Sequence, residues 1–192
     1  MGETLYNLTN PQKSIWDTQE FYSNTPISNI VGTAVVKDKI DFKLFSKAVN
    51  IFLEKSDAFR LKIILDNGEP KQFVEAFSPL SFNILEVSSD RDVEKIAKKM
   101  ADTPFSILNS QLFKFELFRY PDGHGGIILL VHHIVSDAWS CGLFISEIIS
   151  IYDSLLDGSY EDLAANSYID YIESEKEYLS SPKFEKDKAF WL

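Results

Sequence analysis

Residues 127–147 read IILLVHHIVSDAWSCGLFISE, an apolar run followed by two histidines, an aspartate and an amphipathic segment. Its first five residues, Ile127–Val131, are all apolar and mostly β-branched, which predicts a strand buried on both faces. From Trp139 onward the apolar residues recur at spacings of three and four, which predicts a helix over roughly 139–156. Asp137 stands just before that helix, in the position of an N-cap residue.

Two adjacent histidines, His132 and His133, end the predicted strand. Neighbouring side chains of a strand point to opposite faces, so we expect one ring to face a cleft and the other to pack behind it. A neutral imidazole has a reference pKa of about 6.5 and can take a proton from an amine, thiol or hydroxyl near pH 7. His133 could be such a base, and a histidine pair that simply packs at a strand end explains the pattern equally well.

Three other chemistries compete for the same residues. His132, His133 and Asp137 are metal-ligand types, but neighbours on opposite faces of a strand cannot reach one ion without a kink, so we expect no metal site. Cys141 or Ser136 could be a nucleophile, although a lone cysteine on a helix is usually a small buried residue. Asp137 could orient His133 as in a catalytic triad, cap the helix or pair with an arginine, and a structural use is favoured.

Arg60 is a candidate for that pairing. It stands among mostly apolar neighbours at the start of a predicted strand. A half-buried arginine needs a carboxylate, and its guanidinium can donate two parallel hydrogen bonds to one. The residues alone do not single out Asp137 as the partner.

The rest of the chain repeats the same two patterns. Helices are predicted from Asn10, from Asp41, over 88–103, from Ser167 and from Pro182, and strands over 30–36, 59–65, 72–74, 82–87 and 112–120. The turn-rich residues 66–70 join two of these strands in a hairpin. Helices interleaved with strands predict an α/β layer fold with a mixed sheet and flanking helices.

The composition is that of a globular protein with a substantial core. The 192 residues are 45% hydrophobic and 14% aromatic. A net charge of −10, without a run rich in Lys or Arg, argues against nucleic acid and an anionic membrane surface as partners. We see no export signal and no apolar stretch of about 20 residues, and Cys141 is the single cysteine. These features favour a cytoplasmic protein that does not enter a membrane.

Residues 132–140, HHIVSDAWS, resemble the HHxxxDG signature of the condensation domains of nonribosomal peptide synthetases, which belong to the chloramphenicol acetyltransferase-like superfamily. Three further stretches resemble motifs of that family in the same order, namely 8–16 (LTNPQKSIW), 55–61 (KSDAFRL) and 167–172 (SYIDYI). The resemblance spans essentially the whole chain and covers roughly the first of the family's two lobes. It implies that residues 1–192 are the N-terminal lobe of a condensation domain, without the C-terminal lobe.

The resemblance also implies a reaction, in which the amine of a carrier-bound aminoacyl thioester attacks an upstream acyl thioester and forms an amide. His133 corresponds to the catalytic histidine and His132 to a supporting one. Asp137 corresponds to a structural residue that pairs with Arg60. No metal or redox cofactor is implied, because the substrates are carried on phosphopantetheine, with acyl-CoA as a possible donor. The implied partners are carrier proteins and the missing lobe.

Two departures from the family qualify this expectation. Ala138 occupies the family's glycine position, so any role that needs a left-handed backbone or a close approach to that amide is in doubt. The second departure is the single lobe, and we therefore expect the isolated chain to fold without condensing substrates.

Several alternatives stay open. The opening motif and the segment from Ser167 resemble the starter subclass, which acylates the first amino acid of a lipopeptide. Other possibilities are a related O-acyltransferase, an epimerisation domain or a non-catalytic module that docks carrier proteins. An apolar face left by the absent lobe could also be covered in a homodimer.

Overall fold

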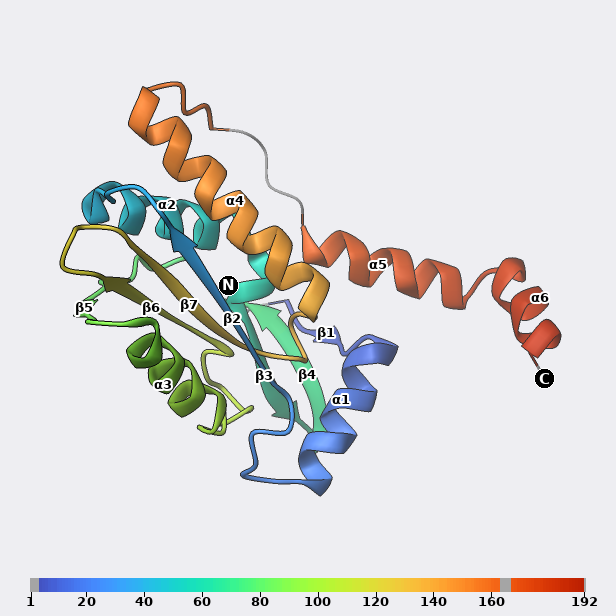
Figure 1. Ribbon diagram of the computed structural model, residues 1–192. Coiled ribbons are helices and arrows are strands. Elements are labelled where there is room, and N and C mark those ends of the chain that lie inside the picture. The colour runs from blue at the N-terminus through green and yellow to red at the C-terminus, as the bar shows by residue number, and fades with distance from the viewer. Residues whose placement is uncertain (1–3, 163–166, 192) are drawn as a thin grey trace.

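Strand β7 (Gly125–His132) forms the centre of the larger sheet, and all its residues are buried. It pairs antiparallel with β2 (Asn29–Val36) on one side and with β6 (Phe113–Arg119) on the other. Strand β5 (Ile84–Glu86) joins β6 in parallel, which makes the sheet mixed, as predicted. The computed structural model describes residues 4–162 and 167–191 (Figure 1).

A smaller antiparallel sheet lies beside the first, in the order β1 (Tyr6–Asn7), β4 (Glu69–Val74) and β3 (Leu61–Asp66). The predicted β3–β4 hairpin is confirmed. Its two turn residues, Asn67 and Gly68, have φ values of 52° and 84°, as a two-residue turn with left-handed central positions requires. The sequence did not predict β1, because two residues are too few to show a period-two pattern.

The helices begin close to the predicted positions. Within the described residues they are α1 (Asn10–Phe21), α2 (Phe42–Lys55), the 3-10 helix η1 (Asp57–Arg60), α3 (Asp90–Ala101), α4 (Ala138–Asp157), α5 (Tyr168–Leu179) and α6 (Pro182–Trp191). Side chains cap four of them by accepting hydrogen bonds from first-turn amides, namely Thr9, Asp41, Asp137 and Ser167. Some predicted boundaries were wrong. Arg60 ends η1 and does not start a strand, and β4 begins at Glu69, inside the predicted turn 66–70.

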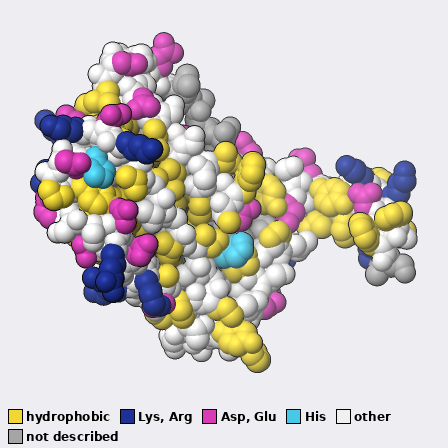
Figure 2. All heavy atoms as spheres, viewed as in Figure 1, with side chains coloured by type: hydrophobic (Ala, Val, Ile, Leu, Met, Phe, Trp, Pro, Cys, Tyr) yellow, Lys and Arg dark blue, Asp and Glu magenta, His cyan; other side chains and the backbone are white. Residues whose placement is uncertain are grey.

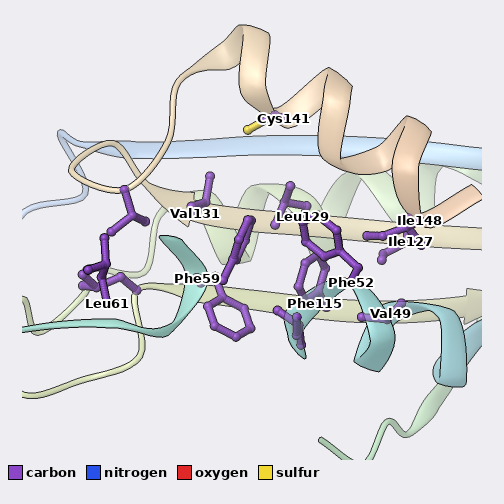
Figure 3. Close-up of a cluster of buried hydrophobic side chains, with 14 of the residues drawn as sticks. Val49, Phe52, Phe59, Leu61, Phe115, Ile127, Leu129, Val131, Cys141 and Ile148 are labelled. Carbon is purple, nitrogen blue, oxygen red and sulfur yellow. The ribbon is translucent and has the colours of Figure 1, made fainter. Parts of the chain in front are cut away.

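The core has a layer on each face of the larger sheet. Helices α2 and α4 pack together over one face, where aromatic rings interlock (Figure 3). The Phe59 ring centre lies 5.1 Å from that of Phe52 and 4.7 Å from that of Phe144. Helix α3 covers the other face with its buried Val93 and Met100. Because both faces are covered, the apolar run of β7 has no polar alternation.

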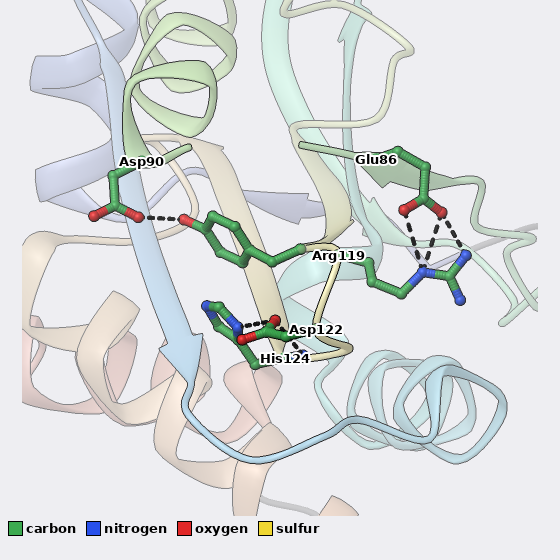
Figure 4. A network of polar contacts seen from close by, with 6 residues as sticks. Glu86, Asp90, Arg119, Asp122 and His124 are labelled. Atoms are coloured by element: carbon green, nitrogen blue, oxygen red, sulfur yellow. Dashed lines mark hydrogen bonds and ion pairs between the residues drawn. The ribbon is translucent and has the colours of Figure 1, made fainter. Parts of the chain in front are cut away.

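The turn between β6 and β7 is held by polar side chains (Figure 4). The Tyr120 hydroxyl donates to the Asp90 carboxylate, and burial, with this hydrogen bond second, raises the pKa of Tyr120 to about 12. The His124 ring stacks on Tyr120 at 4.1 Å between centres, and its Nδ1 bonds the Asp122 carboxylate. That hydrogen bond holds the pKa of Asp122 below its ordinary value.

Helices α5 and α6 extend from the body as an arm (Figure 1). No described side chain of α6 is buried, and Phe190 and Trp191 are 80% and 82% exposed. Hydrophobic side chains are visible over much of the arm (Figure 2). An apolar surface of this kind is typical of a segment that contacts another part of an assembly.

Helix α4 departs from one expectation. Its 20 residues, with a mean hydropathy of 1.2, are long and apolar enough to cross a membrane by length and composition, whereas no such stretch was expected from the sequence. Length and composition are a weak indication, since a core helix of a soluble protein passes the same test. In this structure Ile148 and Tyr152 of α4 pack into the core cluster.

Candidate active site

The end of β7 separates the two histidines, as predicted. His132 is 1% exposed, and its Nε2 bonds the Gln19 Oε1 atom at 3.2 Å. Its Nδ1 accepts from the Ile134 amide at 3.2 Å, so the ring donates through Nε2 and is neutral. Burial, with the nearby His133 second, lowers the pKa of His132 to about 4. His132 is therefore well placed to hold the loop that follows the strand.

His133, in contrast, is exposed. Its Nδ1 donates to the Ser136 carbonyl at 2.8 Å, while its own amide donates to the Ser28 carbonyl at 2.7 Å. A carbonyl can only accept, so this contact puts the proton of the neutral ring on Nδ1 and leaves the lone pair on Nε2. No described residue forms a hydrogen bond with Nε2. The loop thus holds the His133 ring in a fixed orientation with its Nε2 atom accessible.

His133 lines an open hollow of about 280 Å³. The wall comes from α1, from the loop after β7, and from the starts of α4 and α5. Its members include Pro11, Gln12, Ile15, Ser140, Tyr168 and Tyr171. The structure therefore brings three of the four family-like stretches to one place.

Gln12 supports the loop that follows β7 through buried hydrogen bonds. It is 2% exposed, and its Nε2 donates to the Ile134 carbonyl at 3.2 Å. Its side-chain amide also pairs with that of Gln72 through two hydrogen bonds of 2.8 Å. Sequence reasoning missed this support, because a glutamine in the first turn of a helix usually faces water.

Asp137 caps α4, which confirms the predicted structural use. Its Oδ1 accepts from the Ser140 amide at 2.7 Å. Hydrogen bonds from Ser140 hold the pKa of Asp137 below its ordinary value, and His133 contributes in the same direction. The cap sets where α4 begins and so closes the loop that carries His133.

The proposed pair of Asp137 with Arg60 is not present among the described residues. The Arg60 guanidinium donates to the backbone carbonyls of Leu53 and Glu54, at the C-terminal end of α2, and to that of Glu75 at 3.2 Å. Carbonyls at a helix C-terminus lack intrahelical donors and carry partial negative charge, so they attract a cation. Arg60 thus closes α2, and the two residues stabilise different helix ends.

Asp57, which the sequence patterns did not single out, joins the second and fourth motifs. Its carboxylate accepts from the Ser167 hydroxyl at 2.6 Å and from the Tyr168 amide at 2.7 Å. A carboxylate at a helix N-terminus satisfies unpaired amides and complements the helix dipole. Asp57 therefore anchors α5, which supplies one wall of the hollow.

Ala138 and Cys141 have ordinary structural positions. Ala138 is the first residue of α4, and the described non-glycine residues with positive φ are Asn24, Asn67 and Asn109. A left-handed backbone at Ala138 is thus not required. Cys141 is buried, and burial raises the pKa of its thiol, which makes it a poor nucleophile. Within residues 4–162 and 167–191, no group of three or more His, Cys, Asp or Glu could hold a metal ion.

Solved structures define the class of fold. The chain superposes with a TM-score of 0.90 on a variant of the starter condensation domain of rhizomide synthetase RzmA, solved in complex with C8-CoA and Leu-SNAC. The two are 22% identical, and the match covers 98% of this chain and 45% of that one. The fold is that of the chloramphenicol acetyltransferase-like α/β lobes, as predicted.

The family follows from the sequence comparison. Residues 2–192 match the Condensation domain family, and the chain belongs to it. Surfactin synthase subunit 1 of Bacillus subtilis (strain 168) is 36% identical over 199 residues, which cover 100% of this chain and 6% of that protein. Bacitracin synthase 3 of Bacillus licheniformis is 26% identical, over 97% of this chain and 3% of that protein. The chain thus spans a small part of these synthetases and about half of the solved domain.

Proposed function

We propose that this chain is the histidine-bearing N-terminal lobe of an amide-forming condensation domain, with His133 as the catalytic residue. Condensation domains form amide bonds in nonribosomal peptide synthetases. One observation carries the assignment to His133. The Nδ1 contact with the Ser136 carbonyl, at 2.8 Å, leaves the basic Nε2 atom available in the hollow.

In the proposed reaction, an amine nitrogen attacks the carbonyl carbon of an acyl thioester. The new C–N bond forms as the C–S bond breaks, and the amine proton ends on the departing sulfur. His133 Nε2 accepts that proton or accepts a hydrogen bond that directs the amine toward the carbonyl. His132 and Gln12 act by holding the loop, because both are buried and bond Ile134.

The partners and substrates are part of the same proposal. A second lobe would supply the other wall of the hollow, and carrier proteins would deliver the thioesters on phosphopantetheine. The acyl side would be a fatty acyl starter, from a carrier or from CoA, by analogy with the starter domain solved with C8-CoA. No resident cofactor is needed for the residues to act as described, and a reducing cytoplasm would keep the carrier thiol free.

The test uses a complete condensation domain that contains this chain, with carrier-bound substrates. His133→Ala should lower the rate of amide formation by about 10²–10⁴-fold, the usual contribution of a positioned base. His124→Ala is the matched control, because His124 lies in the turn at the opposite end of β7. An unchanged rate for His133→Ala would refute the catalytic role.

A second assay addresses the single lobe. The 192-residue chain alone should form no amide from the same substrates, because the hollow around His133 is open on one side. Turnover by the isolated chain would show that no second lobe is needed.

A further inference from the structure

The side-chain amides of Gln12 and Gln72 form a buried pair next to the loop that follows β7. Gln12 is 2% exposed and Gln72 is 0% exposed, and each donates through Nε2 to the Oε1 of the other at 2.8 Å. Gln72 belongs to β4, the central strand of the smaller sheet, and lies outside the four family-like stretches. It does not line the hollow that contains His133. Any influence of Gln72 on that hollow therefore passes through Gln12.

Backbone groups fix which way each of the two amides points. The Gln72 Nε2 donates to the Asn7 carbonyl at 2.9 Å. The Gln12 Oε1 accepts from the Thr9 amide at 2.9 Å, and the Gln12 Nε2 donates to the Ile134 carbonyl at 3.2 Å. A carbonyl oxygen can only accept and a backbone amide can only donate, so turning either side-chain amide over would set donor against donor or acceptor against acceptor. The pair is thus held in one orientation.

Ile134 connects this pair to the His133 ring. The Ile134 carbonyl accepts from Gln12, while the Ile134 amide donates to the buried Nδ1 of His132 at 3.2 Å. The peptide groups on both sides of Ile134 are therefore held. Two residues later, the Ser136 carbonyl accepts from the His133 Nδ1 at 2.8 Å. Because the backbone is held just before that carbonyl, the carbonyl and the ring bonded to it take one position.

The buried pair is better suited to specifying a conformation than to adding stability. Two hydrogen-bonded amides inside a protein contribute little more than apolar side chains of the same shape would. A fully bonded polar network, in contrast, rigidifies the groups that it contacts and selects a single arrangement of them. Within residues 4–162 and 167–191, every buried side-chain nitrogen and oxygen has a hydrogen-bond partner, so this network is complete.

We propose that Gln72 is a positioning residue for amide formation, which acts on the His133 ring through Gln12. The proposal rests on the proposed function and adds to it a residue of the smaller sheet that touches neither the substrates nor His133. It requires that loss of the Gln72 amide disorders the ring of His133 and slows the reaction without weakening substrate binding.

The kinetic test uses a complete condensation domain that contains this chain, with carrier-bound substrates. Gln72→Met replaces the amide with an apolar side chain of similar length and should lower kcat by about 10–10²-fold, the cost of misplacing a reacting group by up to about 1 Å. KM for both substrates should change less than about twofold, because Gln72 does not line the hollow. An unchanged kcat would overturn the proposal.

Asn50→Leu is the matched control. The Asn50 amide also bridges backbone groups, since it accepts from the Leu80 amide at 2.7 Å and donates to the Leu80 carbonyl at 3.0 Å. It lies on α2, outside the hollow that contains His133. Asn50→Leu should lower the urea midpoint, as Gln72→Met does, but leave kcat unchanged. Equal losses of kcat in the two variants would assign the effect of Gln72 to stability and contradict the positioning role.

Nitrogen NMR of the histidine rings in the 192-residue chain tests the positioning without any reaction. At about pH 8, above the reference pKa of about 6.5, the wild-type His133 ring should carry its proton on Nδ1 alone. Gln72→Met should give a mixture of the two tautomers, and Asn50→Leu should keep one. His133→Gln identifies the signals of this ring. A single Nδ1-protonated tautomer in Gln72→Met would overturn the proposal.

A double variant keeps the test valid if Gln72→Met does not fold. Gln12→Met combined with Gln72→Met leaves neither glutamine amide buried without its partner, so it should be more stable than the sum of the two single losses predicts. It should still show the low kcat and the mixed tautomers. Recovery of kcat together with stability would mean that the pair serves the fold alone.

The outcomes separate this inference from the proposed function. Unchanged amide formation in His133→Ala would refute the proposed function, while mixed tautomers in Gln72→Met would still show that Gln72 orients the ring. Loss of amide formation in His133→Ala, with a normal rate and a single tautomer in Gln72→Met, would keep the proposed function and refute the positioning role.

Discussion

Strand β7 is flanked by a histidine at each end, His124 before it and His133 after it, and the two rings have different settings. At the turn end, the ring of His124 stacks on Tyr120, and its Nδ1 bonds the carboxylate of Asp122. At the loop end, the Nδ1 of His133 bonds a backbone carbonyl, and its Nε2 opens onto a hollow. The partner of the His124 ring is a carboxylate side chain, whereas the partner of the His133 ring is a backbone carbonyl, which can only accept and so sets the tautomer.

The hydrogen-bond partner of each ring, and not its place beside a strand end, therefore decides whether the ring is tied into a polar network or left accessible. The turn end uses its polar groups to tie β6 and β7 to α3, through the Tyr120–Asp90 hydrogen bond. The loop end uses buried groups, His132 and Gln12, to hold an exposed one. Four measurements test this contrast, and the one with the largest expected effect on stability comes first.

The largest effect on stability should come from His132. Its pKa of about 4 in the folded chain lies below the ordinary value of 6.5, so the unfolded chain takes up the proton first. Stability should be complete above about pH 6.5, and about 3 kcal/mol of it should be lost as the pH falls toward 4. Urea unfolding of His132→Gln should show a correspondingly flatter pH dependence. The control His133→Gln removes only the smaller cause of the His132 shift, so most of the wild-type slope should remain, and an equal loss of slope would assign the effect elsewhere.

The next effect concerns Arg60 and Asp137. Arg60→Met should cost about 1.5–3 kcal/mol, because charge-assisted hydrogen bonds to carbonyls are lost. Asp137→Ala should cost about 1 kcal/mol, as for other N-cap residues. Since the two residues stabilise different helix ends, their effects should add within about 0.5 kcal/mol in a double-mutant cycle of urea unfolding. An interaction energy well above 1 kcal/mol between the two substitutions would show that Arg60 and Asp137 form the direct ion pair after all.

A smaller effect is expected at the turn end. Tyr120→Phe removes the hydrogen bond to Asp90 and should destabilise the chain by about 1 kcal/mol. The pKa of Tyr120 is raised to about 12, so its contribution should be present below pH 10 and lost as the pH rises toward 12. Tyr178→Phe on the arm is the matched control, since it breaks an exposed hydrogen bond to Asp187. If Tyr120→Phe and Tyr178→Phe lowered the melting temperature equally, the hydrogen bonds of the turn would not stabilise the fold more than an exposed hydrogen bond does.

The smallest effect should come from Ala138→Gly. Ala138 begins α4 without a positive φ, so glycine relieves no strain and should lower stability by less than about 1 kcal/mol. A gain in thermal stability would mean that the backbone prefers the left-handed region at this position.

Much of the fold could be predicted from local patterns. The apolar run of β7, the aromatic stripe of α2 and the caps at Asp41, Asp137 and Ser167 depend on neighbours within a few residues. Periodicity and capping report such short-range geometry directly. The alternation of His132 and His133 between two faces followed from the same reasoning.

The support of the candidate site could not be predicted in this way. Gln12 and Gln72 are 60 residues apart, and Asp57 and Ser167 are 110 residues apart. Their side chains could each have found water or another partner. The pairing of Asp137 with Arg60, expected from the family resemblance, was wrong because nearer groups satisfy both residues.

The elements, the order of the family-like stretches and the placement of His132 and His133 on opposite faces follow from the sequence alone, because side-chain periodicity and caps act over short distances. Tertiary packing added the support of the loop by Gln12, the anchoring of α5 by Asp57 and the hollow that Tyr168 and His133 line together. Those features depend on which distant surfaces pack together, and packing selects one set of partners from many that the residue types would allow.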